Sequence, residues 1–374
     1  MTTTSDILII GGGVAGLSAG AALAGHGNVH VLEAEDQIGF HSSGRSATMF
    51  HYALGDALIR TLTLASRAFF DRPPEAFGDD PIGRRMAVLV HGRADELAEL
   101  DALEAAIAPF ATLERLDQQG IAELCPLLKV GEDGAVAAIA DMNGMRLDQH
   151  ALLQGYWRLM RAAGGVLTTK ARAAAIVREG GAWRVTTETG EDFAAPILVN
   201  AAGAWADHVA ALAGVALVGL EPLRRTIITF DAPAGTALDH LPFAKTVGDE
   251  LYFAPESGRL FASPMDEVPS EPCDAQPGEY EVALAAFRME ERTRVTVKHV
   301  HSRWAGLRSF TPDRHPAVGF AKDAEGFFWL AGQGGAGLQT SPAMAAMVAA
   351  LVAGTDWPLP TVDPENLSPG RFAR

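Results

Sequence analysis

The stretch Asp6-Ile-Leu-Ile-Ile-Gly11-Gly-Gly-Val-Ala-Gly16 decides the fold of this chain of 374 residues. A short apolar strand runs into glycines spaced G-x-G-x-x-G, and an Ala-rich helix over residues 14–24 follows. A second apolar run, Val29-His-Val-Leu32, ends in Glu33. Strand, glycines, helix, strand and acid in this order are typical of a βαβ unit that binds a dinucleotide. A Gly-rich turn in an ordinary α/β protein is the alternative, but such a turn does not require Glu33.

Each residue of the motif has a physical task. Gly11 permits the tight turn, Gly13 lets a pyrophosphate approach the backbone, and Gly16 lets helix and strand pack closely. The free N–H groups and the positive dipole end of the helix attract the phosphates. Glu33, 20 residues beyond Gly13, is suited to accept hydrogen bonds from a ribose. We therefore predict that these residues hold the nucleotide.

The composition excludes several classes of protein. A chain of 374 residues is too long for one simple core, so two packed domains are expected. A hydrophobic content of 48% with 20% charged residues indicates a soluble globular protein. The net charge of −16 argues against nucleic acid as a partner, because phosphates would be repelled. No apolar run reaches membrane-spanning length, so no integral membrane span is expected.

The cysteines and the N-terminus bear on location. Cys125 and Cys273 lie far apart, without the spacing of a zinc site, so we predict neither a disulfide framework nor a metal centre. The segment Met-Thr-Thr-Thr-Ser-Asp6 lacks a basic region and is expected to lead into a strand, not to act as a signal peptide. These features predict a cytoplasmic protein, peripheral to the inner membrane if a quinone accepts its electrons.

Hydrophobic periodicity predicts the elements of the first half of the chain. Helices are expected over residues 56–70, 94–108 and 148–163. Strands are expected over residues 86–90, 165–167, 173–177, 183–186 and 197–200. The last of these is almost wholly apolar, as in a parallel sheet that is covered on both faces.

From about residue 220 the pattern changes to antiparallel strands, expected over residues 225–230, 251–253, 260–262 and 293–301. The stretch 264–281 is rich in acid and proline and indicates a solvated loop, with a mobile lid over a site as the alternative. After a buried strand at 326–332, a final helix is expected to open at Thr340-Ser341-Pro342. The antiparallel part is therefore predicted to be inserted into a discontinuous nucleotide-binding domain.

Two further Gly-rich elements follow buried strands. Val199-Asn-Ala-Ala-Gly-Ala-Trp205 ends its strand in small residues, which suit either a flat cofactor or simple close packing. Gly332-Gln-Gly-Gly-Ala-Gly337 again places glycine before a helix N-terminus. One dinucleotide contacted along its whole length explains all three elements.

The chain resembles the D-amino-acid oxidase family of flavoproteins, which includes glycine oxidase and sarcosine oxidase, and is most similar to its bacterial D-arginine dehydrogenase type. The resemblance implies FAD and an α/β fold with added antiparallel β-structure. A Rossmann-like FAD-binding domain (1–47, 141–218 and 310–374) would carry an inserted mixed-sheet substrate domain (48–140 and 219–309). The matching stretches are Gly11 to Gly16, His41 to Ser46, Leu64 to Phe70, Val199 to Trp205, Trp304 to Ser309 and Gly326 to Thr340.

The resemblance also implies roles for residues along the cofactor. Gly11, Gly13, Gly16 and Glu33 would hold the ADP half. Arg45 and Ser46 would contact the pyrophosphate, and the backbone of Ala173 would contact the adenine. Gly203 and Trp205 belong to the second Gly-rich element. The flavin ring would lie against Gly335, Gly337, Leu338, Gln339 and Thr340. On its own, Arg45 could equally be a surface arginine. No cysteine stands just before the last helix, so the FAD is expected to be non-covalent.

Three residues match the family's clamp for a substrate carboxylate: Arg225, Tyr252 and Arg308. A buried guanidinium binds a carboxylate in a planar, two-point manner and would fix the α-carbon against the flavin. Arg225 could also belong to a solvated strand face, and Arg308 could form a structural ion pair. His51 is a candidate for assisting deprotonation of the amine, and a polar wall residue is its simpler interpretation.

The expected side-chain pocket contains no acid. Met49, Leu54 and Met86 stand where the D-arginine enzymes carry polar or acidic residues, and Gln339 completes this wall. An unpaired buried charge is costly, so we expect a neutral or apolar side chain in place of a guanidinium. Methionine is adaptable and favours tolerance of several substrates.

These features predict an FAD-dependent enzyme that oxidises the C–N bond of a small D-amino acid to an imino acid, which hydrolyses to a 2-oxo acid and ammonia. Oxygen or a quinone would then take the electrons. A secondary or cyclic amine such as sarcosine or proline is the close alternative. An NAD-dependent reductase is disfavoured because no second complete G-x-G-x-x-G unit is present. A non-catalytic flavin scaffold is a third class.

Overall fold

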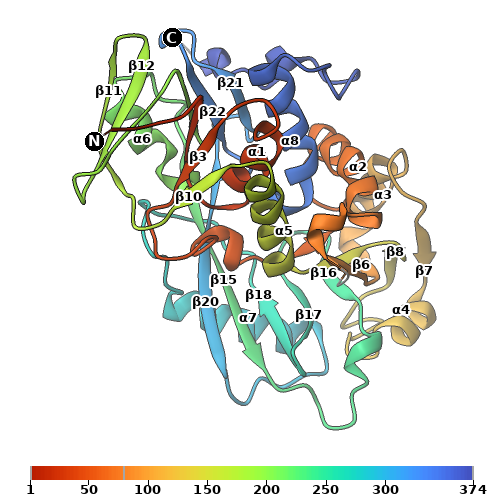
Figure 1. Ribbon diagram of the computed structural model, residues 1–374. Helices are drawn as coiled ribbons and strands as arrows, with labels where there is room; N and C mark the ends of the chain where they lie inside the picture. Colours follow the sequence, from red (N-terminus) through yellow and green to blue (C-terminus); the bar gives the residue numbers. More distant parts are fainter. Residues whose placement is uncertain (1, 79–80, 373–374) are drawn as a thin grey trace.

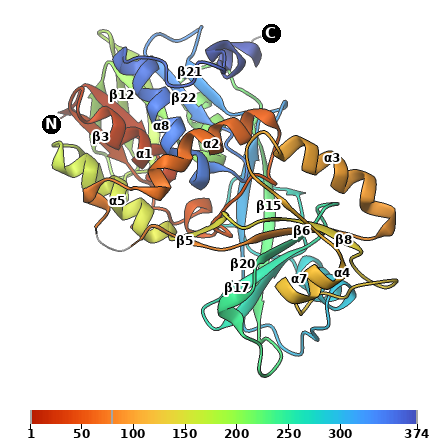
Figure 2. The same cartoon turned by 90° about the vertical axis from the view of Figure 1, so that its right-hand side faces the viewer.

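The computed structural model describes residues 2–78 and 81–372. A mostly parallel sheet with its helices forms one half of the molecule, drawn in the upper part of Figure 1. A large mixed sheet forms the other half, below it. Turning the molecule by 90° shows α3 and the strands β6 and β8 projecting to one side of this second half (Figure 2).

The parallel sheet contains the predicted βαβ unit. β2 pairs with β3 on one side and with β14 on the other, all parallel, so their carboxyl ends meet at one edge. The strand order is β10 (Val166–Thr168), β3 (Val29–Leu32), β2 (Ile7–Ile10), β14 (Ile197–Asn200), β22 (Phe327–Ala331) and β21 (Ala317–Phe320), of which β21 is antiparallel. All four residues of β2 are buried, because helices and a second sheet cover its two faces.

Two smaller sheets flank this core. The four-stranded one has the order β1 (Thr2–Thr4), β13 (Asp192–Ala195), β12 (Ala182–Thr187) and β11 (Ala173–Glu179). The three-stranded one has the order β4 (Met49–Phe50), β9 (Met145–Leu147) and β5 (Gly83–Arg85).

The helices pack mainly on the parallel sheet and on one another. α1 contacts α5 and α8, and α8 also contacts α2. The helices are α1 (Val14–Leu23), α2 (Ala57–Asp71), α3 (Leu97–Ile107), α4 (Gln118–Leu124), α5 (Gln149–Ala162), α6 (Ala206–Leu212), α7 (Glu279–Arg292) and α8 (Gly337–Ala353). Among the helices of the described residues, none combines the length and the apolar content needed to cross a membrane.

The large sheet draws its strands from two distant parts of the chain, residues 88–141 and 221–310. Its order is β19 (Val268–Pro269), β15 (Glu221–Phe230), β18 (Arg259–Ser263), β17 (Tyr252–Glu256), β16 (Phe243–Thr246), β6 (Val88–Gly92), β8 (Ala137–Asp141) and β7 (Glu114–Leu116), and β20 (Ser302–Phe310) pairs with β15.

The two faces of the large sheet join different cores. Its inner face carries Ile227, Phe243 and Tyr252, which belong to the core shared with α1 and α5. Its outer face carries Phe253 and Ala262, which are packed against α7. The strands alternate between these faces, as the period of two requires.

The predicted fold class is confirmed, because an α/β half with a mostly parallel sheet and a mixed, largely antiparallel half are both present. The domain boundaries stay a prediction, which the origin of the large sheet's strands supports. The strand expected at 293–301 is wrong, because the β15 partner begins at Ser302 and the preceding residues pair in no extended ladder. Helix α7 was not predicted, although its buried Val282, Ala285 and Met289 recur at helical spacing.

The last helix begins one turn earlier than expected, at Gly337, so Pro342 lies inside it. A proline there leaves the carbonyl of Leu338 without its helical N–H donor. The hydroxyl of Ser341 donates to that oxygen at 2.9 Å. This side-chain bond lets α8 continue through the proline.

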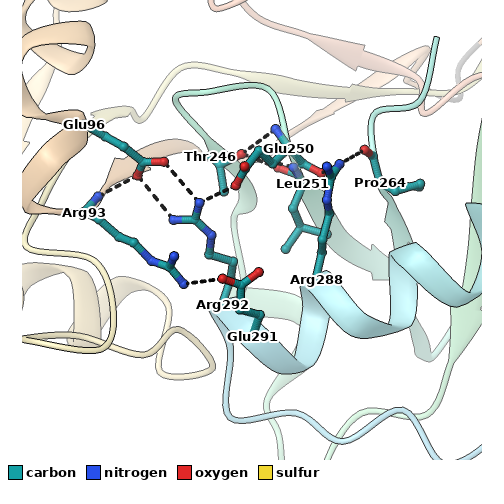
Figure 3. Close-up of polar contacts among 9 residues, drawn as sticks. All are labelled: Arg93, Glu96, Thr246, Glu250, Leu251, Pro264, Arg288, Glu291 and Arg292. Atoms are coloured by element: carbon teal, nitrogen blue, oxygen red, sulfur yellow. Dashed lines mark hydrogen bonds and ion pairs between the residues drawn. The ribbon is translucent and has the colours of Figure 1, made fainter.

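A network of ion pairs behind the large sheet holds the turn between β16 and β17 (Figure 3). Arg292, buried at the end of α7, binds Glu96 at 3.1 Å and also pairs with Glu250 in the turn. Arg288 donates to the carbonyl oxygens of Glu250 and Pro264. The hydroxyl of Thr246 accepts the N–H groups of residues 250 and 251. The turn is thereby fixed just before Tyr252, the first residue of β17.

We expect Arg292→Met to lower the free energy of unfolding by roughly 2–4 kcal/mol, because it leaves Glu96 and Glu250 without their cation. Arg115→Met is the matched control, since Arg115 makes two ion pairs on the exposed face of α3. Its cost should stay below about 1 kcal/mol. Urea unfolding of both variants measures the difference, and equal costs would contradict the structural role of Arg292.

The buried His91 predicts a loss of stability in acid. Burial, together with the charge of Arg292, lowers the pKa of His91 from 6.5 to about 3. Between these values the unfolded chain binds a proton that the native state does not, so stability falls as the pH falls from about 6.5 to about 3. We expect His91→Asn to make this decline shallower, as measured by urea unfolding at several pH values. An unchanged slope would show that His91 does not contribute.

Candidate active site

A cavity of about 1060 Å³ lies between the carboxyl edge of the parallel sheet and the inner face of the large sheet. Glu33 and Ala173 line one end, and Arg308 and Tyr252 line the other. Residues from all three Gly-rich elements of the sequence contribute to its wall. The structure therefore brings these three distant elements together around one space.

The first glycines allow a backbone approach that no other residue would. Gly11 has φ +114°, and a Cβ there would collide with the carbonyl oxygen of Ala201 at the end of β14. A Cβ at Gly16 would collide with the carbonyl oxygen of Gly11. Gly13 precedes α1 and lines the cavity, whereas Gly16 lies behind the wall. Gly11 and Gly16 thus shape the turn, and Gly13 is open to a ligand.

Glu33 closes the same end of the cavity. It is buried, and its two carboxylate oxygens accept the N–H groups of Gly12 at 2.6 Å and Glu35 at 2.8 Å. An ionised carboxylate offers about four acceptor positions, so capacity remains for ribose hydroxyls. Ala173, at the start of β11, lines the cavity nearby.

Arg45 lines the cavity, but its guanidinium is engaged by the protein. It pairs with Asp274 at 2.6 Å and donates to the carbonyl oxygens of Ala275 and Ala305. The hydroxyl of Ser46 accepts the N–H of Thr48 at 3.0 Å. Direct binding of a pyrophosphate by Arg45 and Ser46 stays a prediction. Their contacts within the protein occupy donors and acceptors that such binding would use.

The second Gly-rich element lines the middle of the cavity. Gly203 has φ +56°, and no atom lies within 4 Å of the place that a Cβ would take, so its backbone conformation, not crowding, favours glycine there. The ring of Trp205 lies 4.5 Å from that of His41. Both Gly203 and Trp205 contribute to the wall.

The third element supplies the wall next to Arg308. Gly335, Gly337 and Leu338 line the cavity at the start of α8. A Cβ at Gly335 would lie 2.9 Å from the guanidinium carbon of Arg308, so glycine lets this side chain lie flat against the loop.

The side chains of Gln339 and Thr340 face the interior of the protein, so their contact with the flavin ring stays a prediction that these side chains do not support. Gln339 is buried and bonds to both backbone groups of His51 and to the hydroxyl of Thr63. The Thr340 hydroxyl donates to the carbonyl of Ala336. Both residues stabilise the wall from behind.

The predicted clamp residues come together at the far end of the cavity. Arg225 on β15 and Arg308 on β20 are diagonal neighbours, since Arg225 lies opposite Gly306 and Arg308 lies opposite Leu223. Tyr252 extends from β17 into the same end. Burial, with the charge of Arg225 beside it, lowers the pKa of Arg308 to about 10. Arg308 is therefore still a cation at neutral pH, one that faces the cavity and is largely withdrawn from bulk solvent.

Several polar atoms of this cluster lack partners within the described part of the chain. The side chain of Arg225 donates to the carbonyl of Asp266 at 2.6 Å and pairs with Glu267 at 3.2 Å, which leaves its Nη1 without an acceptor. The buried hydroxyl of Tyr252 also has no partner there. An unsatisfied buried donor costs about 1–3 kcal/mol, which an acceptor on a ligand would relieve.

His51 lies beside the clamp and not in the cavity wall. It is buried, its ring is 5.4 Å from that of Phe243, and Phe243 in turn contacts Tyr252. Burial, and then the charges of Lys245 and Arg308, lower the pKa of His51 to about 3. The imidazole is therefore neutral at physiological pH.

The apolar residues expected in the side-chain pocket pack elsewhere. Met49 and Met86 are buried in the core shared with α5, and Leu54 packs against the core of the parallel sheet. Each is absent from the cavity wall formed by the described residues. Their contact with the substrate stays a prediction, and the packing of these side chains into the hydrophobic core speaks against it.

Two features near the site were not predicted from the sequence. Lys245 is a buried cation on β16 opposite Tyr252 and does not belong to the cavity wall formed by the described residues. The only sequence signal for it is one charge in an otherwise apolar strand. The segment 269–272 lines the cavity beside its acidic neighbours Asp266, Glu267 and Asp274, which hold Arg225 and Arg45. The predicted loop is thus a cover over the cavity, tied down by ion pairs.

These features fit FAD. The cavity volume is at the upper end of that of small-molecule sites and suits a dinucleotide with a small substrate. Glycines without room for a side chain border both of its ends, and the N-terminus of α1 opens into it. Unsatisfied donors remain at the end opposite Glu33.

Comparison with known proteins agrees with this geometry. Residues 6–351 match the family model described as FAD dependent oxidoreductase, DAO. The bovine (Bos taurus) FAD-dependent oxidoreductase domain-containing protein 1 is 25% identical over 99% of this chain and 84% of its own length. Glycine oxidase of Geobacillus kaustophilus is 25% identical over 94% of both chains.

Solved structures show the same fold. The crystal structure of that glycine oxidase superimposes with a TM-score of 0.84 over 98% of both chains. The L-proline dehydrogenase of P. horikoshii gives a TM-score of 0.84 at 20% identity, over 100% of this chain and 98% of its own. The expected family is confirmed, whereas the particular relation to D-arginine dehydrogenases stays a prediction. The chain belongs to the DAO family of FAD-dependent oxidoreductases, with FAD as its cofactor.

Proposed function

We propose that the protein oxidises the C–N bond of a small α-amino acid, taken in the D configuration, to an imino acid that water converts to a 2-oxo acid and ammonia. The observation that supports this most is the cluster of Arg225, Tyr252 and Arg308, with donors left free, at one end of the cofactor cavity. The D configuration rests on the family resemblance of the sequence. Among the relatives, glycine oxidase and L-proline dehydrogenase bear names that indicate amino-acid oxidation.

The residues of the chain would act mainly by binding and orientation. Arg308 and the free Nη1 of Arg225 would receive the two oxygens of the substrate carboxylate, and the hydroxyl of Tyr252 would donate to the same group. FAD, when bound, accepts the α-hydrogen with two electrons. Fixing the carboxylate from the large sheet sets the position of the α-carbon relative to the loop at Gly335.

His51 is a weak candidate for the proton acceptor of the amine. A general base works best when its pKa lies near the working pH, whereas the pKa of His51 is about 3. We therefore infer that His51 serves as a neutral polar neighbour and that the substrate binds with its amine already neutral or loses the proton to water.

The direct test is an anaerobic titration of the FAD-loaded protein with single amines, following the flavin absorbance. D-amino acids, their L-enantiomers, glycine, sarcosine and D-proline form the panel, with lactate as an alcohol in place of an amine. Bleaching by D-amino acids supports the proposal, and bleaching by sarcosine or proline alone supports the secondary-amine alternative. If dithionite bleaches the flavin and no amine does, the proposed function is wrong.

Arg308→Met should lower kcat/KM for an amino acid by about 10- to 100-fold, mainly through KM, because a charge-assisted hydrogen bond to the carboxylate is lost. Arg303→Met is the control on the same strand, since Arg303 is 45% exposed and pairs with Glu279. Steady-state kinetics with equal FAD content checks both. A loss confined to kcat, or an equal loss in the control, would contradict the binding role of Arg308.

Met86→Glu tests the prediction that Met86 lines the pocket for the substrate side chain. We expect it to destabilise the protein by roughly 3–5 kcal/mol, because it buries a carboxylate in the core, and to leave the order of preferred substrates unchanged. Met142→Glu, at a methionine that is 44% exposed, should cost little. A switch toward basic amino acids in folded Met86→Glu would restore Met86 to the substrate pocket.

A further inference from the structure

Glu267 lies in the segment that covers the cavity, and its carboxylate contacts one arginine of the clamp. Its Oε1 accepts a hydrogen bond from Nη2 of Arg225 at 3.2 Å. Arg225 lines the cavity, whereas Glu267 does not belong to the cavity wall formed by the described residues. Glu267 therefore acts on a ligand in the cavity only through Arg225.

The same carboxylate has a second cation on its other side. Nη2 of Arg314 donates to both oxygens of Glu267, at 3.0 Å and 3.2 Å. Arg314 follows β20, its guanidinium carbon lies 3.7 Å from the centre of the Phe310 ring, and its side chain is 53% exposed. Arg225, by contrast, is buried. Glu267 thus divides one negative charge between a buried arginine of the clamp and an arginine at the surface.

The backbone around Glu267 is fixed, so only its side chain is able to choose between these partners. The carboxylate of Asp266 accepts the N–H and the hydroxyl of Thr226 at 2.8 Å and 2.9 Å. The residues that follow Glu267 pair with β15 as strand β19. The carbonyl oxygen of Asp266 also accepts Nε of Arg225 at 2.6 Å. The segment therefore holds Arg225 through its backbone even when the side chain of Glu267 turns away.

These contacts leave one nitrogen of Arg225 for a ligand. Its Nε and Nη2 are occupied, and its buried Nη1 has no acceptor in the described part of the chain. Burial and the charge of Arg225 lower the pKa of Arg308 to about 10, and the charge of Glu267 opposes this shift. Glu267 thus acts electrostatically on both arginines that the proposed function assigns to the substrate carboxylate.

Two carboxylates on one guanidinium repel each other. A substrate carboxylate at Nη1 of Arg225 binds the same planar group as the carboxylate of Glu267 at Nη2, so the two like charges lie only the width of that group apart. Repulsion at such a distance is large compared with the affinity of a small ligand. Binding is therefore easier when Glu267 gives its charge to Arg314.

Resting on the function proposed above, we propose that Glu267 is an internal competitor of the substrate carboxylate and sets how tightly the clamp holds substrate and product. In the empty site Glu267 neutralises part of the charge of Arg225. When a carboxylate binds Arg225 and Arg308, Glu267 turns to Arg314, to which it is already bonded. The imino acid keeps the same carboxylate, so the return of Glu267 to Arg225 favours its release. Glu267 is a positioning residue that does not touch the substrate itself.

The test measures the binding of propionate, a carboxylate without an amine, to the FAD-loaded protein by calorimetry and through the change in flavin absorbance. Propionamide has nearly the same shape and no charge, so it reports the contacts that do not depend on charge. Glu267→Gln removes the competing charge, while its amide oxygen still accepts Nη2 of Arg225. We expect this variant to lower the Kd of propionate by about tenfold and to change that of propionamide by less than about twofold.

Arg314→Met has the opposite expected effect. It leaves Glu267 paired with Arg225 alone among the described residues, so the Kd of propionate should rise by about three- to tenfold. The methionine chain still covers the ring of Phe310, and the position is exposed. Opposite shifts from two neighbouring changes distinguish the competition from a merely structural role, because a loss of fit would weaken binding in both variants.

Glu281→Gln is the matched control. Glu281 pairs with Arg224 at 3.2 Å, so this change also removes a carboxylate from an arginine of β15. Arg224 precedes Arg225 in the strand and therefore projects to the opposite face, and it is absent from the cavity wall formed by the described residues. The Kd of propionate should change by less than about twofold.

Steady-state kinetics with D-alanine gives a second readout. Glu267→Gln should lower KM and should not raise kcat, because an interaction that weakens substrate and product alike changes binding and not the chemical step. A higher KM in this variant would mean that Glu267 only supports the fold of the cover, and the competition would be wrong.

The outcomes separate this proposal from the proposed function. If the wild-type protein binds propionate and oxidises D-alanine, but Glu267→Gln binds propionate equally or more weakly, the competition is wrong and the proposed function stands. If the shifts with propionate are as expected and no amine bleaches the flavin, the proposed function is wrong and the competition stands. Absence of propionate binding in all the proteins overturns both. If Glu267→Gln does not fold, Arg314→Met decides: a higher Kd supports the competition, and an unchanged or lower one contradicts it.

Discussion

The close approach of backbone to backbone at the carboxyl edge of the parallel sheet is the constraint on which the site depends. Gly11 leaves β2 with a positive φ and touches the carbonyl of Ala201 at the end of β14. Any side chain there would separate the two strand ends and move α1 away from the edge. Because β2, β14 and β22 end side by side, the loops that follow them meet around one cavity. The FAD site thus forms because the parallel strands end close together, and Gly11 has no side chain that would keep the ends of β2 and β14 apart.

The large sheet adds charge to this space. Arg225 and Lys245 are buried on its inner face, and Arg308 borders the cavity beside them. Of the three, only Arg225 has a carboxylate partner that is mostly withdrawn from solvent. Poorly paired cations are unfavourable in a low-dielectric interior, so Arg225 and Arg308, which line the cavity, support the proposed binding of an anionic ligand there. The outer face, by contrast, contains a network in which Arg292 and Arg288 satisfy the groups around them. The outer face thus stabilises the sheet, whereas the inner face carries the donors that the proposed function assigns to the substrate carboxylate.

Local patterns in the sequence predicted the fold well where secondary structure and function coincide. The βαβ unit, the buried strand before Val199–Trp205 and the Gly-rich start of α8 were all found because glycine spacing has a direct geometric meaning. Where the signal was weaker, errors followed. Helix α7 was not predicted, because its acidic and apolar residues continue an acid- and proline-rich loop. The strand that pairs with β15 was placed too early, at residues 293–301, whereas β20 begins at Ser302. Pro342 suggested a helix start, but Ser341 satisfies the carbonyl that the proline leaves free.

By itself the sequence determined the nucleotide-binding half, because that half depends on residue types at fixed local spacing. FAD and the candidate residues of the carboxylate clamp followed from the resemblance of several stretches to a known family. The tertiary structure decided which side chains line the cavity. Met49, Leu54 and Met86 belong to the cores, Gln339 to the support of the wall, and Lys245 to the neighbourhood of Tyr252. Such assignments depend on which strands pair and in which register, and a shift of one residue would turn Lys245 to the opposite face. The register of β16 against β17 is set by the short turn that joins them, whereas the pairing of β16 with β6 joins distant parts of the chain and is encoded by no local pattern.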